Sequence, residues 1–218
     1  MRRLIALGVA GVVLLVLIVA QLVLPGVAAR RLRDELSHSG TVLSVKVSAF
    51  PAIELLWGDA DTVVVRLGRY RTGSSQIGSR LAGVGGVGTL DVSAQEVEWG
   101  VITLHDAVLR KRGGELVGSA TIMESDLRSA VPFLDDVSPV ASSGGQLVLR
   151  GTASLFGLSA SLDAVVAARD GALVVAPDIP FGGIATITLF DDPHVQVQSV
   201  SAATVPGGFK LVSAASVH

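Results

Sequence analysis

An apolar segment near the N-terminus, Leu4 to Leu24, constrains this chain more than any other feature. Gln21 is its one strongly polar residue. A helix rises 1.5 Å per residue, so a segment of about 20 residues spans about 30 Å, the thickness of the hydrocarbon core of a bilayer. The pattern therefore predicts a single transmembrane helix. We expect residues 1–26 to form a membrane anchor or signal segment and residues 27–218 to form one β-rich domain.

The sequence leaves open whether this segment is cleaved and which way it is oriented. A signal peptide needs only about 7–15 apolar residues and a pattern of small residues at its cleavage site, which Val27-Ala28-Ala29 provides. The longer apolar run favours an uncleaved anchor, whereas cleavage would make the protein secreted. Two arginines precede the segment and three follow it before residue 34, so the positive-inside rule does not decide the orientation.

The composition limits the classes of function that the domain can have. The formal net charge is −2, and it falls to about −4 without Arg2 and Arg3. Domains that bind nucleic acid carry a strongly basic surface, so we expect no nucleic-acid partner. The chain has no cysteine, which excludes disulfides, thiolate metal ligands and a thiol nucleophile. Aromatic residues make up only 4% of the chain, so the interior must be mainly aliphatic.

After Ser39-Gly40 the hydrophobic period changes to two residues, as in strands with one buried face. Gly113-Gly114 and Asp170-Gly171 each separate two such segments and predict hairpins. We expect nine or ten strands, mostly antiparallel, over residues 43–48, 63–67, 89–101, 107–110, 115–123, 162–169, 172–176, 184–190, 195–202 and 209–217.

Helices and loops are marked by other signals. Pro25-Gly26 is expected to end the membrane helix, and residues 27–37 to form a short amphipathic helix after it. Ser125 can cap an internal helix whose apolar face includes Leu127. Residues 135–145, which contain Pro139 and two glycines, are expected to form a mobile loop.

Several motifs that suggest chemistry lack the context which that chemistry requires. Residues 83–88 fit the dinucleotide pattern G-x-G-x-x-G, yet residues 89–92 alternate like a strand instead of opening a helix. His105-Asp106 could act as a base and its orienting acid, but no serine signature accompanies the pair. Acidic pairs at turns, such as Asp135-Asp136, are interpreted as solvated, with calcium as the alternative ligand. We expect no catalytic residue, no metal and no cofactor.

Four arginines, Arg66, Arg69, Arg71 and Arg80, lie in a stretch of the chain that contains no acidic residue. A guanidinium group binds phosphate bidentately, so contact with phosphate headgroups at a membrane is one interpretation. The alternative is a solvated strand edge that resists pairing with another sheet.

The most distinctive segment is Ala49 to Gly58. A strand ends at Phe50-Pro51, and apolar residues without alternation follow. Such a segment either fills a core or lines an apolar cavity, and the sequence alone does not choose between these two roles.

This segment and its surroundings resemble the LmeA-like phospholipid-binding family of actinobacterial cell-envelope proteins. The strand that runs into Phe50-Pro51 and then into two leucines and Gly58 carries the resemblance, together with the valine-rich strand 62–67. So do residues 120–127, a strand entering a helix, and the closing hairpin 195–217. Two departures, Ala49 for the usual glycine and Ala52 for a bulkier residue, bear on the shape of a pocket.

The resemblance implies an α+β fold in which a long curved antiparallel sheet wraps around one or two short helices. It implies a non-catalytic protein that binds or transfers phospholipid on the extracytoplasmic, periplasmic side of the cell membrane. A groove lined by aliphatic side chains takes up acyl chains at about 25 cal/mol per Å² of buried apolar area. The expected lipid-binding residues are Phe50, Pro51, Ile53, Leu55, Leu56, Trp57, Leu127, Val131 and Phe133. The alternative is a membrane-anchored adaptor that supports envelope enzymes, with a filled core and protein partners that the sequence does not name.

Overall fold

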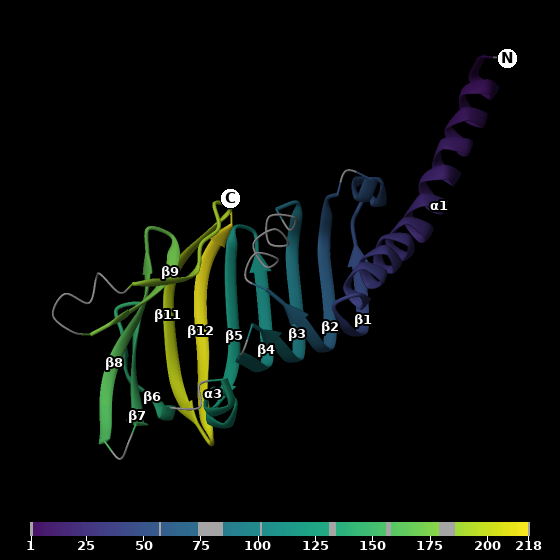
Figure 1. Ribbon diagram of the computed structural model, residues 1–218. Helices are drawn as coiled ribbons and strands as arrows, with labels where there is room; N and C mark the ends of the chain where they lie inside the picture. The colour runs from purple at the N-terminus through teal and green to yellow at the C-terminus, as the bar shows by residue number, and fades with distance from the viewer. Residues whose placement is uncertain are drawn as a thin grey trace.

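In the computed structural model, a long N-terminal helix leads into two β-sheets that follow one another along the molecule (Figure 1). The structure describes the backbone of residues 2–56, 58–73, 85–100, 102–130, 134–155, 158–178 and 186–217. It describes side chains within 18–52, 54–55, 58–73, 85–100, 102–126, 129, 137–140, 144–152, 159–178 and 186–217.

One continuous helix, α1 (Arg2–Ser37), replaces the two helices that the sequence predicted. Pro25 lies inside it, so the prediction that Pro25-Gly26 ends the membrane helix is wrong. Proline removes the hydrogen bond to the carbonyl of Gln21, four residues earlier. Packing of α1 against the first strand and the short helix after it compensates for this loss.

Over the residues that the structure describes, no helix meets the length and hydropathy needed to cross a membrane.

Seven strands form the first sheet, in the order β1-β2-β3-β4-β5-β12-β11 (Figure 1). All neighbours are antiparallel except β2 and β3, which are parallel. A 3-10 helix, η1 (Ala52–Leu56), follows β1, and α3 (Glu124–Ala130) follows β5. The predicted internal helix is thus present, but it begins one residue before Ser125, which lies inside it and is not its cap. The strands are β1 (Gly40–Ser48), β2 (Ala60–Thr72), β3 (Val87–Trp99), β4 (Ile102–Arg112), β5 (Glu115–Met123), β11 (Val195–Val205) and β12 (Gly208–Val217).

Five strands form the second sheet, in the order β10-β9-β8-β7-β6, so the single long sheet that the resemblance implied is two sheets. Residues predicted as a mobile loop are strand β6, and its partner β7 was not predicted at all. Pro139 is tolerated because β6 is an edge strand, and its register shifts beside that residue. The strands are β6 (Leu134–Ser143), β7 (Gln146–Leu155), β8 (Leu158–Arg169), β9 (Ala172–Pro177) and β10 (Ile187–Phe190).

One face of the first sheet is apolar because the register keeps aliphatic side chains in phase from strand to strand. Val65 pairs with Val92, and Val92 pairs with Leu109, so their side chains point to the same side. The opposite face carries their polar neighbours, among them Arg66 and Ser93. The alternation in the sequence therefore predicted this two-sided sheet correctly.

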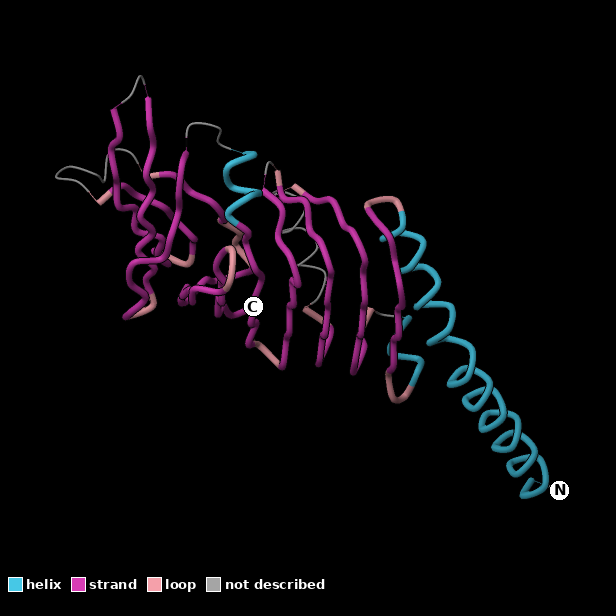
Figure 2. Tube along the Cα trace, turned by 90° about the horizontal axis from the view of Figure 1, so that it is seen from below, coloured by secondary structure: helices cyan, strands magenta, loops and turns pink. Residues whose placement is uncertain are grey.

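Both ends of the apolar face are covered (Figure 2). The C-terminal half of α1 lies along β1, where Leu36 is buried and Leu32 packs beside it. At the other end the second sheet packs on β11, with Leu147 and Val166 against Val200. The core thus forms where the apolar face meets a second layer.

We predict that Phe209→Ala lowers the free energy of unfolding by about 3–5 kcal/mol. Phe209 lies on the apolar face of β12, opposite Ile122, and is only 2% exposed. Val212→Ala is the matched control on the other face of β12, where Val212 is 38% exposed, and it should cost less than about 1 kcal/mol. Denaturation of the full chain in detergent measures both values, and equal losses would contradict the assigned faces.

Candidate functional site

The apolar face continues between its two covered ends. Leu109, on β4, packs both against the cluster beside α1 and against the cluster formed by Leu116, Val195 and their neighbours. Val92 and Ala107, on the same face, are half-buried. Seven strands about 4.8 Å apart make the whole sheet about 29 Å wide, and α1 and the second sheet cover its two ends. An acyl chain reaches about 15 Å, half of a bilayer's hydrocarbon core, which is about the width of four neighbouring strands.

Lys111 is a buried cation on this apolar face, and it is only 3% exposed. Its ammonium group donates hydrogen bonds to the backbone oxygens of Gly85, at 3.3 Å, and Val87. These bonds offset the cost of burying the charge and tie the segment before β3 to β4. Sequence reasoning missed this buried role of Lys111. The alternation of the strand could have revealed it. Lys111 is two residues from Leu109 and therefore points to the same apolar face, whereas Arg110 and Arg112 point to the other face.

The glycine-rich segment leads into strand β3, which confirms the strand predicted from the alternation of residues 89–92. Gly85 and Gly86 form the turn, and β3 begins at Val87, so no helix opens there to receive a pyrophosphate. The Gly86 oxygen accepts a hydrogen bond from the Ala60 amide at 3.1 Å. A Cβ at Gly86 would lie 2.4 Å from Oδ1 of Asp59, so a larger residue there would displace the Asp59 side chain.

The Phe50-Pro51 turn is held against α1. The Gln21 side chain donates to the Ala49 oxygen at 3.2 Å and accepts from the Ala52 amide at 2.8 Å. Ala49 and Ala52 are 5% and 1% exposed, so the two departures from the family pattern leave small residues where the turn meets its surroundings closely. Phe50 itself is 79% exposed.

The structure places only part of the expected lipid-binding set. Leu55 packs against the cluster beside α1, whereas Phe50 and Pro51 are exposed. The apolar segment after the turn therefore contributes to the core at Leu55. The other predicted side chains lie outside the described residues, namely Ile53, Leu56, Trp57, Leu127, Val131 and Phe133.

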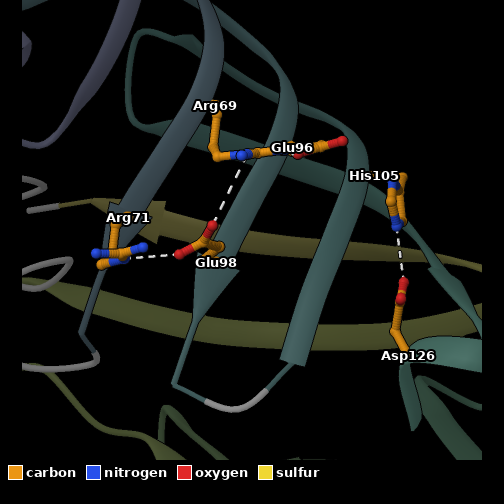
Figure 3. A network of polar contacts seen from close by, with 6 residues as sticks. All are labelled: Arg69, Arg71, Glu96, Glu98, His105 and Asp126. Atoms are coloured by element: carbon orange, nitrogen blue, oxygen red, sulfur yellow. Dashed lines mark hydrogen bonds and ion pairs between the residues drawn. The ribbon is translucent and has the colours of Figure 1, made fainter. Parts of the chain in front are cut away.

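The arginine stretch is paired with glutamates across the parallel β2–β3 register (Figure 3). Arg69 Nε lies 2.7 Å from Glu96 Oε2, and Arg71 Nε lies 2.6 Å from Glu98 Oε2. The hydrogen bond from Arg71 lowers the pKa of Glu98, and the hydrogen bond to Glu96 raises the pKa of Arg69. These ion pairs are exposed and face solvent, so each contributes little stability.

A polar pocket of about 670 Å³ lies beside these pairs, lined by His38, Arg69, Arg71 and Glu98 among others. Arg66 lines a second pocket, of about 260 Å³, with Leu43 and Asp106. Arg80 lies outside the described residues. Among the described residues, Arg66 lines a different pocket from Arg69 and Arg71, and headgroup contact by the predicted arginines stays a prediction.

His105 pairs with Asp126 and not with the neighbouring Asp106. The distance between His105 Nε2 and Asp126 Oδ2 is 2.7 Å, and this contact joins β4 to the first turn of α3 (Figure 3). Asp106 has a positive φ of 49°, where the register between β4 and β5 shifts. The proposed base and orienting acid are thus not assembled. Among the described residues, no three side chains are grouped so as to hold a metal ion.

Comparison with known protein families matches residues 16–209 to the family described as LmeA-like phospholipid-binding. This range takes in the last part of the apolar segment and every strand from β1 to β11, and it ends at the start of β12. No curated protein and no solved structure matches the chain.

We predict that Arg71→Gln raises the titration midpoint of the Glu98 carboxyl toward its ordinary value of 4.5. Because the pKa of Glu98 is lowered in the folded state, its pairing stabilises the fold above about pH 4.5, and this stabilisation is lost as the pH falls further. Carboxyl NMR measures the midpoint. Arg66→Gln is the control, since Arg66 lies beside Ser93 and should leave Glu98 unchanged.

Proposed function

Since the chain belongs to the LmeA-like phospholipid-binding family, we propose that it binds phospholipid without catalysis and transfers it within the cell envelope. The observation that carries this proposal is the largely aliphatic face of the first sheet, which extends between α1 and the second sheet. A family match over residues 16–209 covers most of the chain, so the assignment does not rest on one motif.

The bound lipid would lie with its acyl chains along the half-buried part of this face, near Val92, Ala107 and Leu109. Burial of apolar area supplies about 25 cal/mol per Å², so a chain that covers several strands gains several kcal/mol. The side chains of this strip are aliphatic and make no directed polar contacts. Selection would therefore depend more on the acyl chains than on the headgroup.

We further propose that Leu4 to Leu24 anchors the protein in the cytoplasmic membrane, with the sheets on the extracytoplasmic side. Four apolar side chains of α1 in the second half of this segment are at least half exposed: Ile18, Val19, Leu22 and Val23. An apolar surface of this kind is stable in lipid and unfavourable in water. Because α1 continues without a break onto β1, the anchor would hold the apolar face close to the bilayer.

We predict that the full chain, purified in mild detergent, carries phospholipid in native mass spectrometry and accepts it from donor vesicles. Ala107→Trp places a bulky ring on the apolar face, and a loss of about 60 Å² of lipid contact would lower uptake about tenfold. Val117→Trp is the matched control, because Val117 is 45% exposed on the polar face of β5.

A chain that neither carries nor takes up phospholipid would overturn the proposal. Recovery of a stable protein partner by crosslinking in its place would favour the adaptor function. Equal uptake by the two tryptophan variants would leave lipid binding standing but would move it away from this face.

A further inference from the structure

The one strongly polar residue of the apolar segment is bonded to the domain. Gln21 uses both atoms of its amide, one on the Ala49 oxygen and the other on the Ala52 amide. These two backbone groups flank Phe50-Pro51. The turn is therefore fixed to the helix inside the segment predicted to lie in the membrane.

A second contact holds the turn from the strand side. The Phe50 amide donates to Oδ2 of Asp61, on β2, at 2.6 Å. With its backbone held by Gln21 and Asp61, the turn still leaves the Phe50 ring 79% exposed, the largest exposure among the large apolar side chains described. Leu22, beside Gln21 on α1, follows at 77%. The most exposed aromatic and the most exposed aliphatic side chain thus lie at the same end of the molecule.

The position of Gln21 along α1 sets the depth of the turn. If the hydrocarbon core ends at Leu24, Gln21 lies three residues, or about 4.5 Å, inside it. If the core ends just before Gln21, residues 4–20 remain, which is the shortest length that spans a bilayer. In both cases the turn bonded to Gln21 lies at the boundary between hydrocarbon and headgroups.

We propose that the Phe50-Pro51 turn is a second membrane contact, in which the Phe50 ring enters the leaflet that faces the domain. This inference rests on the proposed anchoring by Leu4 to Leu24. The turn brings no cation, since Glu54 lies in η1 and Asp61 accepts from the Phe50 amide. Insertion of the Phe50 ring is therefore driven by apolar contact, and we expect it to be the same with and without anionic lipid.

The contact would also decide which end of the apolar face meets the bilayer. Ser48, before the turn, pairs with Thr62, and Thr62 pairs with Thr89 near the start of β3. The membrane-facing end is thus the one where Lys111 holds the Gly85–Val87 segment. With the helix as its one membrane contact, the whole molecule could still turn about the helix axis relative to the bilayer. A second contact at the turn would fix its orientation.

The experiment uses the absence of native cysteine, so that single-cysteine variants can be labelled directly. Phe50→Cys and the control Leu43→Cys receive a nitroxide label in the full chain. Leu43 is 51% exposed on β1, and it lines the pocket beside Arg66 on the polar face. Both proteins are placed in phosphatidylcholine vesicles, with and without phosphatidylglycerol, and relaxation by oxygen is compared with relaxation by an aqueous nickel chelate.

We expect the ratio of oxygen to nickel accessibility to be several-fold higher at position 50 than at position 43, with both lipid compositions. Adding Gln21→Leu to the Phe50→Cys chain keeps the helix apolar but removes both hydrogen bonds to the turn. The ratio at position 50 should then fall toward that at position 43.

Equal ratios at the two positions in an anchored chain would overturn the inference. So would a label at position 50 that is shielded from both reagents, since that pattern indicates a protein partner or a second copy of the chain. Phospholipid uptake is measured on the same vesicles. Normal uptake with position 50 in water overturns the second contact alone, and a label in the bilayer without uptake overturns the transfer function alone.

Discussion

The register between strands is the constraint on which the rest of this structure depends. It keeps aliphatic side chains on one face through antiparallel and parallel pairs alike, from Val45 on β1 to Ala215 on β12. A sheet of this width cannot bury its apolar face against one short helix. The chain therefore covers it twice, with α1 at one end and the second sheet at the other, and Val92, Ala107 and Leu109 stay half-buried between them.

Local patterns predicted the elements well and their assembly poorly. Alternation located the strands of the first sheet, and Gly113-Gly114 and Asp170-Gly171 marked two hairpins that the structure contains. Pro25 and Pro139 led to wrong predictions, because the stability that a helix or strand loses at a proline depends on its surroundings. At Pro25 tertiary packing supports the interrupted helix, and at Pro139 the strand lies on the edge of its sheet. Neither context can be seen in the surrounding residues.

The charges of the site show the same limit. Arg69 and Arg71 lie in a stretch without acids, yet the parallel register places Glu96 and Glu98 beside them. His105 finds its partner, Asp126, on a helix that starts two elements later. A sequence shows neighbours along the chain, whereas these pairings are between residues 21 to 27 positions apart. Lys111 is a different case, because its spacing of two residues from Leu109 is visible in the sequence and predicts an inward-facing side chain.

Gln21 links the N-terminal helix to the domain, and it shows what cleavage of that helix would change. A polar residue in a bilayer is costly unless its hydrogen bonds are made, and here both are made by the domain. Cleavage beside Val27-Ala28-Ala29 would remove Gln21 and leave the Ala49 oxygen and the Ala52 amide without it. Ala52 is 1% exposed with α1 in place, so the Gln21 side chain satisfies an amide that would otherwise be buried without a partner. The contact therefore ties the packing of the turn to the presence of the N-terminal helix.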